Sequence, residues 1–356
     1  MRSTGIIHVA TDLVGRLTAG RAARFEASPC GSRRAAMIGG AAALTWPLAG
    51  VYAREAVEAW PSRPITLIVP YPTGGANDML GRLIGQKLAE RLKQQVIVDN
   101  RPGAGTLIGA SQAARAAPNG YTLFLGGFAS NAVTPLLIKT DFHPVDDFAP
   151  IGLIGTAPMV VITHEASPYR TLKDVIDAAR ANPGRLTYGS SGNGSPLHMA
   201  GVSFCLKNKL DMAHVPYKGG SAHILDLMAG RLDVIFDSTT NATPLITGAK
   251  VRPIAVSAKA RMPDFPDVPT FAEAGIPDVE VNGWYALYAP TRTPASILAT
   301  LSAALQEALA SPDVIERLRS VGVTPGTGTR RELADYTASE YAKYRALVRD
   351  GGIKVD

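Results

Sequence analysis

The sequence predicts an α/β protein of two lobes, each with a mainly parallel sheet, and a ligand cleft between them. Short β-rich runs alternate with helical stretches after Trp60, which is the pattern of parallel βαβ units. Two segments, 159–179 and 284–305, each place an apolar strand before a turn with Pro and then a helix. Such paired strands would carry the chain from one lobe to the other and back. With 356 residues, 46% of them apolar, the chain is long enough for about two domains with a core in each.

The elements follow from the apolar runs, taken in chain order. The first series has strand ITLIV at 65–69, a helix from about Asp78, strand 95–99, a helix from Thr106, and strands 121–127, 149–155 and 159–164. The second series has helix 172–184 ended by Asn-Pro-Gly, strand 185–191, helix 195–208 and apolar runs at 213–219, 223–230, 232–238 and 251–258. We place lobe 1 at 60–157 plus 286–356 and lobe 2 at 158–285, with the ligand site between them.

Residues 1–53 are predicted to be a cleaved signal peptide. Arg33-Arg34 precede an apolar run of signal-peptide length, and small residues suit cleavage after Ala53. The pair allows twin-arginine export or an ordinary basic region. A membrane anchor is the rival interpretation, but Gly and Pro interrupt the run before it reaches the roughly 20 residues of a bilayer span. Export to the periplasm would remove Cys30 and leave Cys205 alone, so the mature chain has no intramolecular disulfide.

Charge argues against nucleic-acid binding. The formal net charge is +6, and residues 1–53 carry six Arg against one Asp and one Glu, which is +4 and leaves +2 for the rest. No basic run is interleaved with aromatic residues in that remainder.

The stretch VPYPTGGANDML, residues 69–80, runs from a strand through a glycine turn into an amphipathic helix. Ligands collect beyond the carboxyl ends of strands in open α/β sheets, where helix N-termini favour anions. Glycines at 74 and 75 allow a ligand to approach the backbone, and Asn77 or Asp78 could cap the helix. A plain strand-to-helix turn is the alternative.

A second stretch, TYGSSGNGSPLH at residues 187–198, repeats this design. A strand is followed by Gly-Ser-Ser-Gly-Asn-Gly and then by Ser195-Pro196, and Pro suits the first helical position. Small and hydroxyl residues in a row offer N–H and O–H donors to a carboxylate. Two such stretches, one in each lobe, indicate a clamp that closes on the ligand from both sides.

Other chemistries fit the spacing poorly. The run GAGTLIG at 103–109 is one residue off the dinucleotide fingerprint, and the absence of a Gly-Lys pair excludes a P-loop. Ser190 and Ser191 lie outside a G-x-S-x-G elbow. His164-Glu165 lacks a second His at zinc-binding spacing, and His198 and His214 are interpreted as structural or pocket-lining. No cofactor or metal is expected.

Eight segments, in order, resemble the Bug-type periplasmic solute-binding proteins of tripartite tricarboxylate transporters. They are WPSRPITLIVPYPTGGANDML, VDNRPGAGTLIGA, GYTLF, DDFAPIGLIG, YGSSGNGSPLHMAG, VPYKGG, VPTFAEAG and GWYALYAP. The resemblance covers the whole mature chain. It implies a two-lobed Venus-flytrap fold, a small carboxylate as ligand, membrane permease subunits as partners, and no covalent chemistry. A monomer is expected.

The resemblance also implies the site residues. Lobe 1 would contribute Tyr71, Thr73, Gly74, Gly75, Asn77 and Asp78, and lobe 2 would contribute Ser190, Ser191, Asn193, Ser195 and His198. Ser130 and Asp237 follow or end predicted strands and are added because strand ends face such clefts. The family often has Pro or Ala where Thr73 stands, so ligand identity does not transfer from relatives.

Two alternatives to transport stay open from the residues. An exported serine hydrolase would use Ser190 or Ser191 with His198, and turnover of ester substrates would reveal it. A ligand sensor would keep the binding chemistry and exchange the permease for a receptor.

Overall fold

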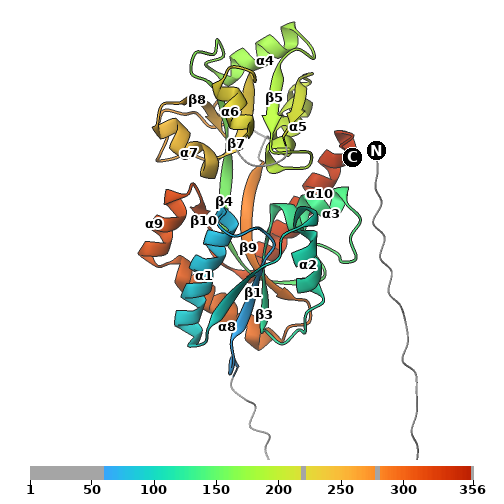
Figure 1. The fold of residues 1–356 in the computed structure, drawn as a ribbon, viewed down its shortest axis with the longest axis vertical. Helices are drawn as coiled ribbons and strands as arrows, with labels where there is room; N and C mark the ends of the chain where they lie inside the picture. Colours follow the sequence, from blue (N-terminus) through green and yellow to red (C-terminus); the bar gives the residue numbers. More distant parts are fainter. Residues whose placement is uncertain (1–59, 218–221, 277–280, 354–356) are drawn as a thin grey trace, which may run out of the picture. The chain divides into compact units, whose positions relative to one another are not determined.

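The computed structural model describes residues 60–217, 222–276 and 281–353, and the predicted signal peptide lies outside these ranges. In the described ranges a ten-stranded mixed sheet runs in the order β2-β1-β3-β9-β4-β7-β5-β6, with β8 and β10 also paired to β4 (Figure 1). The strands are β1 (Ile65–Val69), β2 (Val96–Asn100), β3 (Thr122–Gly127), β4 (Phe148–His164), β5 (Thr187–Ser190), β6 (Ala213–Pro216), β7 (Val234–Ser238), β8 (Val251–Val256), β9 (Asn282–Pro290) and β10 (Thr324–Pro325).

Strand β4 has 17 residues and joins the two halves of this ten-stranded arrangement. These halves are called the first sheet and the second sheet below. The first part of β4 pairs with β9 and β10 in the first sheet, and its second part pairs with β7 and β8 in the second sheet. The prediction of two separate strands, 149–155 and 159–164, is wrong. The intervening residues stay extended because Thr156, Ala157 and Pro158 continue the antiparallel ladder against Trp284, Gly283 and Asn282.

Among the described strands, the parallel ladders involve the two strands that precede the glycine-rich stretches, β1 and β5, and the neighbours of these strands. Strand β1 is parallel to β2 and β3, and β5 is parallel to β6 and β7. The described pairs that involve β4 or β9 are antiparallel. The α/β class is therefore confirmed. The prediction of mainly parallel sheets is wrong, because β4 and β9 pair antiparallel and make both sheets mixed. The lobe boundaries remain a prediction.

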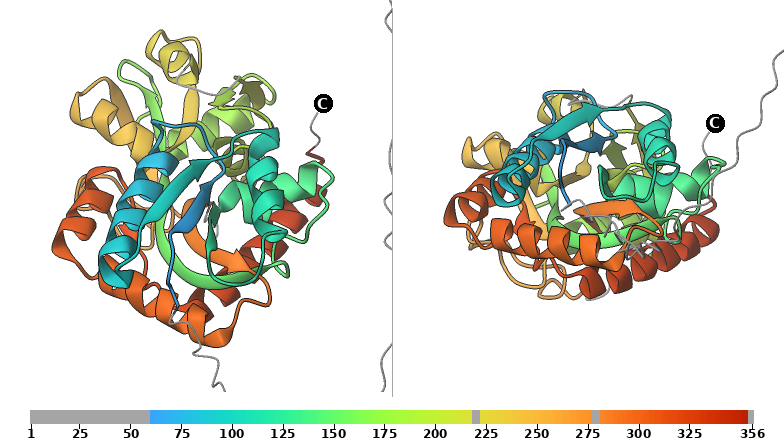
Figure 2. Two further views of the ribbon diagram at one scale, coloured as in Figure 1. Left: turned by 60° about the horizontal axis from the view of Figure 1, so that its bottom comes forward. Right: turned by 90° about the horizontal axis from the view of Figure 1, so that it is seen from below.

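Helices cover both faces of the first sheet. They are α1 (Ala76–Leu92), η1 (Ala104–Thr106), α2 (Leu107–Ala114), η2 (Ala129–Val133), α3 (Thr134–Leu137), α8 (Ala295–Leu309), α9 (Pro312–Ser320) and α10 (Arg330–Asp350). Side chains alternate along β1, so Ile65, Leu67 and Val69 join a core with α1 and α8, while Ile68 joins one with α2 and α10. The right-hand view in Figure 2 shows these two helix pairs on opposite sides of the strands.

The second sheet carries α4 (Leu172–Ala181), α5 (Pro196–Asn208), α6 (Ala222–Met228) and α7 (Thr239–Thr247). Residues of α4 and α5 belong to the same core cluster as Phe236 of β7. Residues of α6 and α7 pack with Val160 and Ile162 of β4 in a separate cluster. Helix α4 begins with a complete capping box between Thr171 and Asp174.

The described residues contain neither a candidate membrane span nor a candidate metal site. None of the described helices has the length and apolar character needed to cross a membrane. Within the same residues, no group of three or more His, Cys, Asp or Glu side chains could hold a metal ion.

Candidate functional site

Loop 1, residues 70–75, joins β1 to α1. Gly74 has φ +88°, a left-handed conformation that favours glycine, and Gly75 is the helix N-cap with extended backbone and no side-chain cap. The prediction that Asn77 or Asp78 caps the helix is therefore wrong, because the helix already begins at Ala76. Its first backbone hydrogen bond is donated by the Met79 N–H to Gly75 O at 3.0 Å. The N–H groups of residues 76–78, in the first turn, have no partner in the described structure.

Asp78 anchors loop 1 from the first turn of α1. Its carboxylate is buried and accepts the Gly74 N–H at 2.9 Å, Arg82 at 3.0 and 3.1 Å, and Asn100 Nδ2 at 3.0 Å. Asn100 also donates to Tyr71 O at 3.0 Å, which ties both ends of the loop to β2. Hydrogen bonds from Arg82 and from Gly74 lower the pKa of Asp78 to about 2. The charge of Asp78 is thus compensated within the protein.

The other predicted residues of lobe 1 differ in exposure. Thr73, Gly74 and Gly75 are exposed, and Tyr71 and Asn77 are half-buried. Burial and the neighbouring Tyr285 of β9 raise the pKa of Tyr71, which places its ring beside a strand that pairs with β4.

Ser130 is buried at the end of β3, in η2. Its Oγ accepts the Gly127 N–H at 3.1 Å and donates to Asn131 Oδ1 at 2.6 Å. Asn131 is also buried and donates to Pro144 O at 2.9 Å. Because the Ser130 hydroxyl is already bonded to the backbone and to an amide, it shapes the strand end.

Loop 2, residues 191–195, joins β5 to α5. Ser195 is the N-cap of α5, with its Oγ accepting the His198 N–H at 3.2 Å, and Pro196 occupies the first helical turn as predicted. Gly194 has φ +73° and its N–H donates to His198 Nδ1 at 3.0 Å. Ser190 and His198 are buried, Ser191 and Ser195 are half-buried, and Asn193 is exposed.

Ser190 bonds to His214 rather than to His198. The Ser190 Oγ and His214 Nε2 atoms are 2.7 Å apart, and the same hydroxyl accepts the Gly192 N–H at 3.1 Å. A hydrolase based on Ser190 and His198 is thus not supported by geometry, and no carboxylate in the described part of the chain bonds to His214. His198 and His214 stack with ring centroids 4.0 Å apart. Burial lowers the pKa of each to about 4, so both rings are neutral at neutral pH.

Asp237 ends the buried part of β7. Its Oδ1 accepts the Ser238 N–H at 2.7 Å and Asn241 Nδ2 at 3.1 Å, and its Oδ2 lies 3.2 Å from His223 Nε2. Both Asp237 and His223 are buried. A Cβ added to Gly189 would lie 3.4 Å from His223 Cβ, so this pair supports the strand that leads into loop 2.

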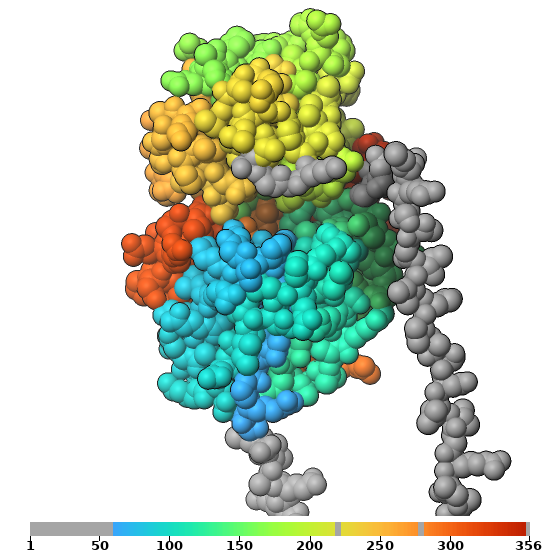
Figure 3. Space-filling model, viewed as in Figure 1, coloured from blue at the N-terminus to red at the C-terminus, as the bar shows by residue number. Residues whose placement is uncertain are grey.

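Two contacts join elements of the second sheet to elements of the first. A Cβ on Gly194 would lie 2.2 Å from Leu137 Cδ1 of α3, and the φ of +73° at this position also favours glycine. Thr239 of α7 donates to Gly322 O at 2.7 Å. Figure 3 shows the blue segment that leads into α1 below the yellow and orange segments of α6 and α7 on one face.

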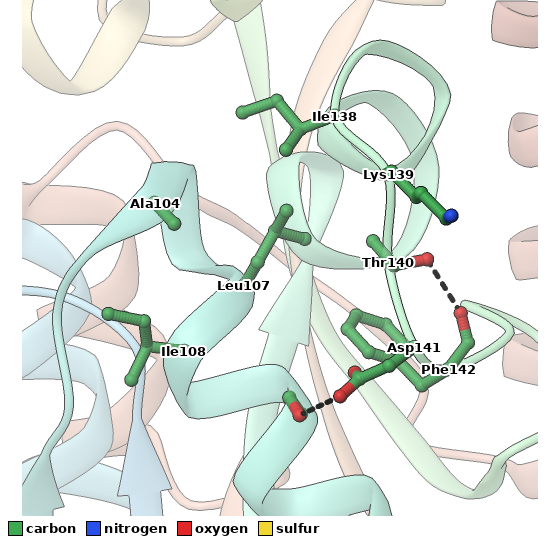
Figure 4. Close-up of a pocket in the computed structure, with 9 residues that line it drawn as sticks. Ala104, Leu107, Ile108, Ile138, Lys139, Thr140, Asp141 and Phe142 are labelled. Carbon is green, nitrogen blue, oxygen red and sulfur yellow. Dashed lines mark hydrogen bonds between the residues drawn. The ribbon is translucent and has the colours of Figure 1, made fainter.

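A separate cavity of about 550 Å³ lies between α2 and residues 138–142 (Figure 4). Leu107, Ile108 and Ile138 line it, and Ser111 donates to Asp141 at 3.3 Å along one side. None of the predicted site residues is among those that line this cavity. The predicted ligand site is therefore assigned from the strand-end loops and not from this cavity.

Sequence reasoning missed the residues that hold the loops in place. These are Arg82, Asn100, Asn131 and His223. His214 is the one that the sequence indicated as structural or pocket-lining, but without its bond to Ser190. Arg82 had a local signal, since it lies four residues after Asp78 on one helix face. The remaining partners bond across strands or turns, and no spacing along the chain indicates those contacts.

Residues 80–353 match the profile of the tripartite tricarboxylate transporter family receptor. Protein BugT of Bordetella pertussis is 31% identical over 313 residues, which is 86% of this chain and 95% of BugT.

Solved structures resemble the chain at a similar level. One described as a periplasmic transporter is 37% identical, with TM-score 0.73, and covers 84% of this chain and 100% of its own. Rpa4515 of R. palustris, solved with adipate, is 33% identical with TM-score 0.73 and coverages of 83% and 99%. MatC of Rhodopseudomonas palustris, solved with malate, is 31% identical with TM-score 0.70 and coverages of 81% and 99%. These similarities confirm the predicted periplasmic-binding-protein fold.

Proposed function

Because the chain belongs to the tripartite tricarboxylate transporter receptor family, we propose that it captures a small carboxylate between loop 1 and loop 2 and delivers it to a membrane permease. The chain is a solute-binding receptor and not an enzyme. The observation that carries the proposal is the pair of loops. Each leads from a strand of a parallel pair into the N-terminus of a long helix, where N–H groups favour an anion.

The chemistry of the loops favours a carboxylate over a more highly charged anion. Loops 1 and 2 contain no Arg or Lys, and the nearby Arg82 is paired with Asp78. Backbone N–H groups, hydroxyls and water would therefore receive the ligand. The adipate and malate bound by related proteins are dicarboxylates of this class. Tyr71, Thr73 and Asn77 on one side, with Ser191, Asn193 and His198 on the other, are the side chains proposed to surround it.

Ligand binding would shift a conformational equilibrium. A carboxylate that touches both loops binds best where the loops are closest, so it favours a closed arrangement of the two sheets. The closed surface would be the one that the permease recognises.

A thermal-shift panel with calorimetry tests the proposal. Adipate and malate are the first probes, followed by other mono- and dicarboxylates, with neutral sugars as the matched negative set. A ligand that binds only the folded state raises the melting temperature, so at least one carboxylate should give a shift of a few degrees at saturating concentration. Stabilisation by sugars with no response to any carboxylate would overturn the proposal.

We also propose export with removal of residues 1–53, which lie outside the described residues. Sequencing the N-terminus of protein from a periplasmic extract should give a start near Arg54. Full-length protein in the membrane fraction would contradict this part of the proposal and leave the binding chemistry untouched.

A further inference from the structure

Three aromatic rings from three elements stack beside loop 2. The planes of His198 on α5 and His214 on β6 are 10° apart with centroids 4.0 Å apart. Tyr188 on β5 lies 4.9 Å from His214 at 24° and 6.5 Å from His198 at 17°. Because each ring restrains the next, the two imidazoles have fixed planes.

Each imidazole also bonds to a different part of the loop. His214 Nε2 meets the Ser190 hydroxyl at 2.7 Å, where β5 enters the loop. His198 Nδ1 accepts the Gly194 N–H at 3.0 Å, just before the helix begins. An acceptor Nδ1 carries no proton, so a neutral His198 must carry its proton on Nε2. That N–H donates to no residue in the described part of the chain.

The surroundings keep this proton arrangement stable. Burial lowers the pKa of both imidazoles to about 4, and the proximity of His214 contributes at His198. The titratable neighbours on the packed elements are Tyr188 of β5 and Cys205 of α5, and burial raises the pKa of each, so both are neutral. Among the described residues no carboxylate bonds to either ring.

We propose that His214 is a positioning residue, which holds the Ser190 hydroxyl by a hydrogen bond and the His198 ring by stacking, so that His198 presents an uncharged Nε2–H to the ligand carboxylate. This inference rests on the proposed function, since it names the donor that the ligand meets. A neutral donor attracts a carboxylate by a hydrogen bond and not by a full charge. The affinity then depends on the orientation of the His198 ring, which His214 of β6 fixes from outside the loop.

The first test reads the proton position in the ligand-free protein. NMR of protein with ¹⁵N-labelled histidine distinguishes the two tautomers and follows their titration. We expect His198 in the Nε2–H form with no titration between pH 8 and pH 5, and a shift of its Nε2–H signal when adipate or malate binds. A Nδ1–H tautomer, or titration with a midpoint above pH 6, would overturn the proposal even if no ligand had been found.

The second test is a double-mutant cycle by calorimetry with whichever of adipate and malate binds more tightly. His214→Phe keeps a flat ring and removes Nε2, and Ser190→Ala removes the same bond from the other side. Each substitution should raise the dissociation constant about tenfold. The double variant should bind as tightly as either single variant, because both substitutions remove the same hydrogen bond. His143→Phe, at an exposed ring outside the loops, is the control and should bind like wild type.

The outcomes separate the inference from the proposed function. If wild type binds and both single variants bind equally well, or if their effects simply add, the role of His214 is refuted and carboxylate capture stands. If wild type binds neither probe nor any other carboxylate, the proposed function fails. The His198 Nε2–H signal compared between wild type and His214→Phe then decides whether His214 positions the ring, and an unchanged signal refutes that role.

Discussion

Loop 1 and loop 2 both lead from a strand of a parallel pair into a helix, yet the groups that hold them differ in charge. Loop 1 is held by a charged network, in which the Asp78 carboxylate accepts from Arg82, Asn100 and the Gly74 backbone. Loop 2 is held by uncharged groups, namely the Ser195 cap, the Ser190 hydroxyl and two neutral imidazoles. The same geometry at a helix N-terminus can thus be fixed by ionic or by neutral chemistry.

The difference has a consequence for the ligand. Beside loop 1, the charged groups Arg82 and Asp78 of α1 neutralise each other, with Arg82 exposed and Asp78 buried. In loop 2 the titratable groups are uncharged near neutral pH. A carboxylate would therefore meet partial charges from two helix ends and no unpaired ionic side chain from the loops.

The largest effect is expected from breaking the charged network. Asp78→Ala leaves three donors, on Arg82, Asn100 and Gly74, without their acceptor. We expect the free energy of unfolding, measured by urea titration, to fall by about 3 kcal/mol. Asp99→Ala is the matched control, because its ion pair with Arg101 is more exposed and should cost less than about 1 kcal/mol. Equal losses in the two variants would show that the network has no special role.

Affinity should respond most to the exposed tip of loop 1. Gly75 has φ −86°, and a Cβ placed there meets no atom within 4 Å, so the fold tolerates a larger residue. Gly75→Val places a branched side chain where the ligand is proposed to approach the backbone, and the dissociation constant should rise at least about tenfold. Gly75→Ala should give a smaller rise. Calorimetry that shows no change for Val, with an unchanged melting temperature, would remove loop 1 from the site.

The two loops should also lose stability in different pH ranges. The folded-state pKa of His198 and His214 is about 4, against 6.5 without burial. The unfolded chain therefore takes up protons first as pH falls, and the free energy of unfolding drops between about 6.5 and 4. Asp78 has a folded-state pKa of about 2 against 3.8, so its contribution is lost only as pH falls from about 4 to 2.

Urea titrations across this pH range measure both losses of stability. We call the loss linked to the imidazoles the upper step and the loss linked to Asp78 the lower step. Asp78→Ala should reduce the lower step, to which other carboxylates with a lowered pKa also contribute, and should keep the upper one. His214→Phe should reduce the upper step. If the upper step persists unchanged in His214→Phe, His214 does not contribute to it.

Part of this site could be predicted from the sequence because its signals are local. Glycine pairs and runs of Ser and Gly between an apolar strand and a helix are visible in any short window, and they placed both loops correctly at strand ends. Pro196 and Ser195 likewise indicated the start of α5. The α/β class followed from alternation of strand-like and helix-like runs, which is also a local property.

The rest of the site could not be predicted, because it depends on contacts between segments that are far apart in the sequence. Asn100 reaches Asp78 only because β2 pairs with β1, and His214 reaches Ser190 only because β6 pairs with β5. The single strand β4 escaped prediction for the same reason. Gly155 and Pro158 are typical of a turn, but pairing with β9 keeps the backbone extended between them.

The smallest effect is expected when the cap of loop 2 is made like that of loop 1. Gly75 caps α1 without a side chain, whereas Ser195 caps α5 through Oγ. Ser195→Gly should lower the free energy of unfolding by only a few tenths of a kcal/mol, because water can replace the hydroxyl at an open helix end. Ser195→Ala should cost about 1 kcal/mol, since a methyl group neither bonds to the His198 N–H nor leaves room for water. Urea titration of both variants measures the order. If Gly costs more than Ala, the hydroxyl is not acting as a cap, and the Ser195 side chain must stabilise loop 2 by a contact that glycine removes and alanine keeps.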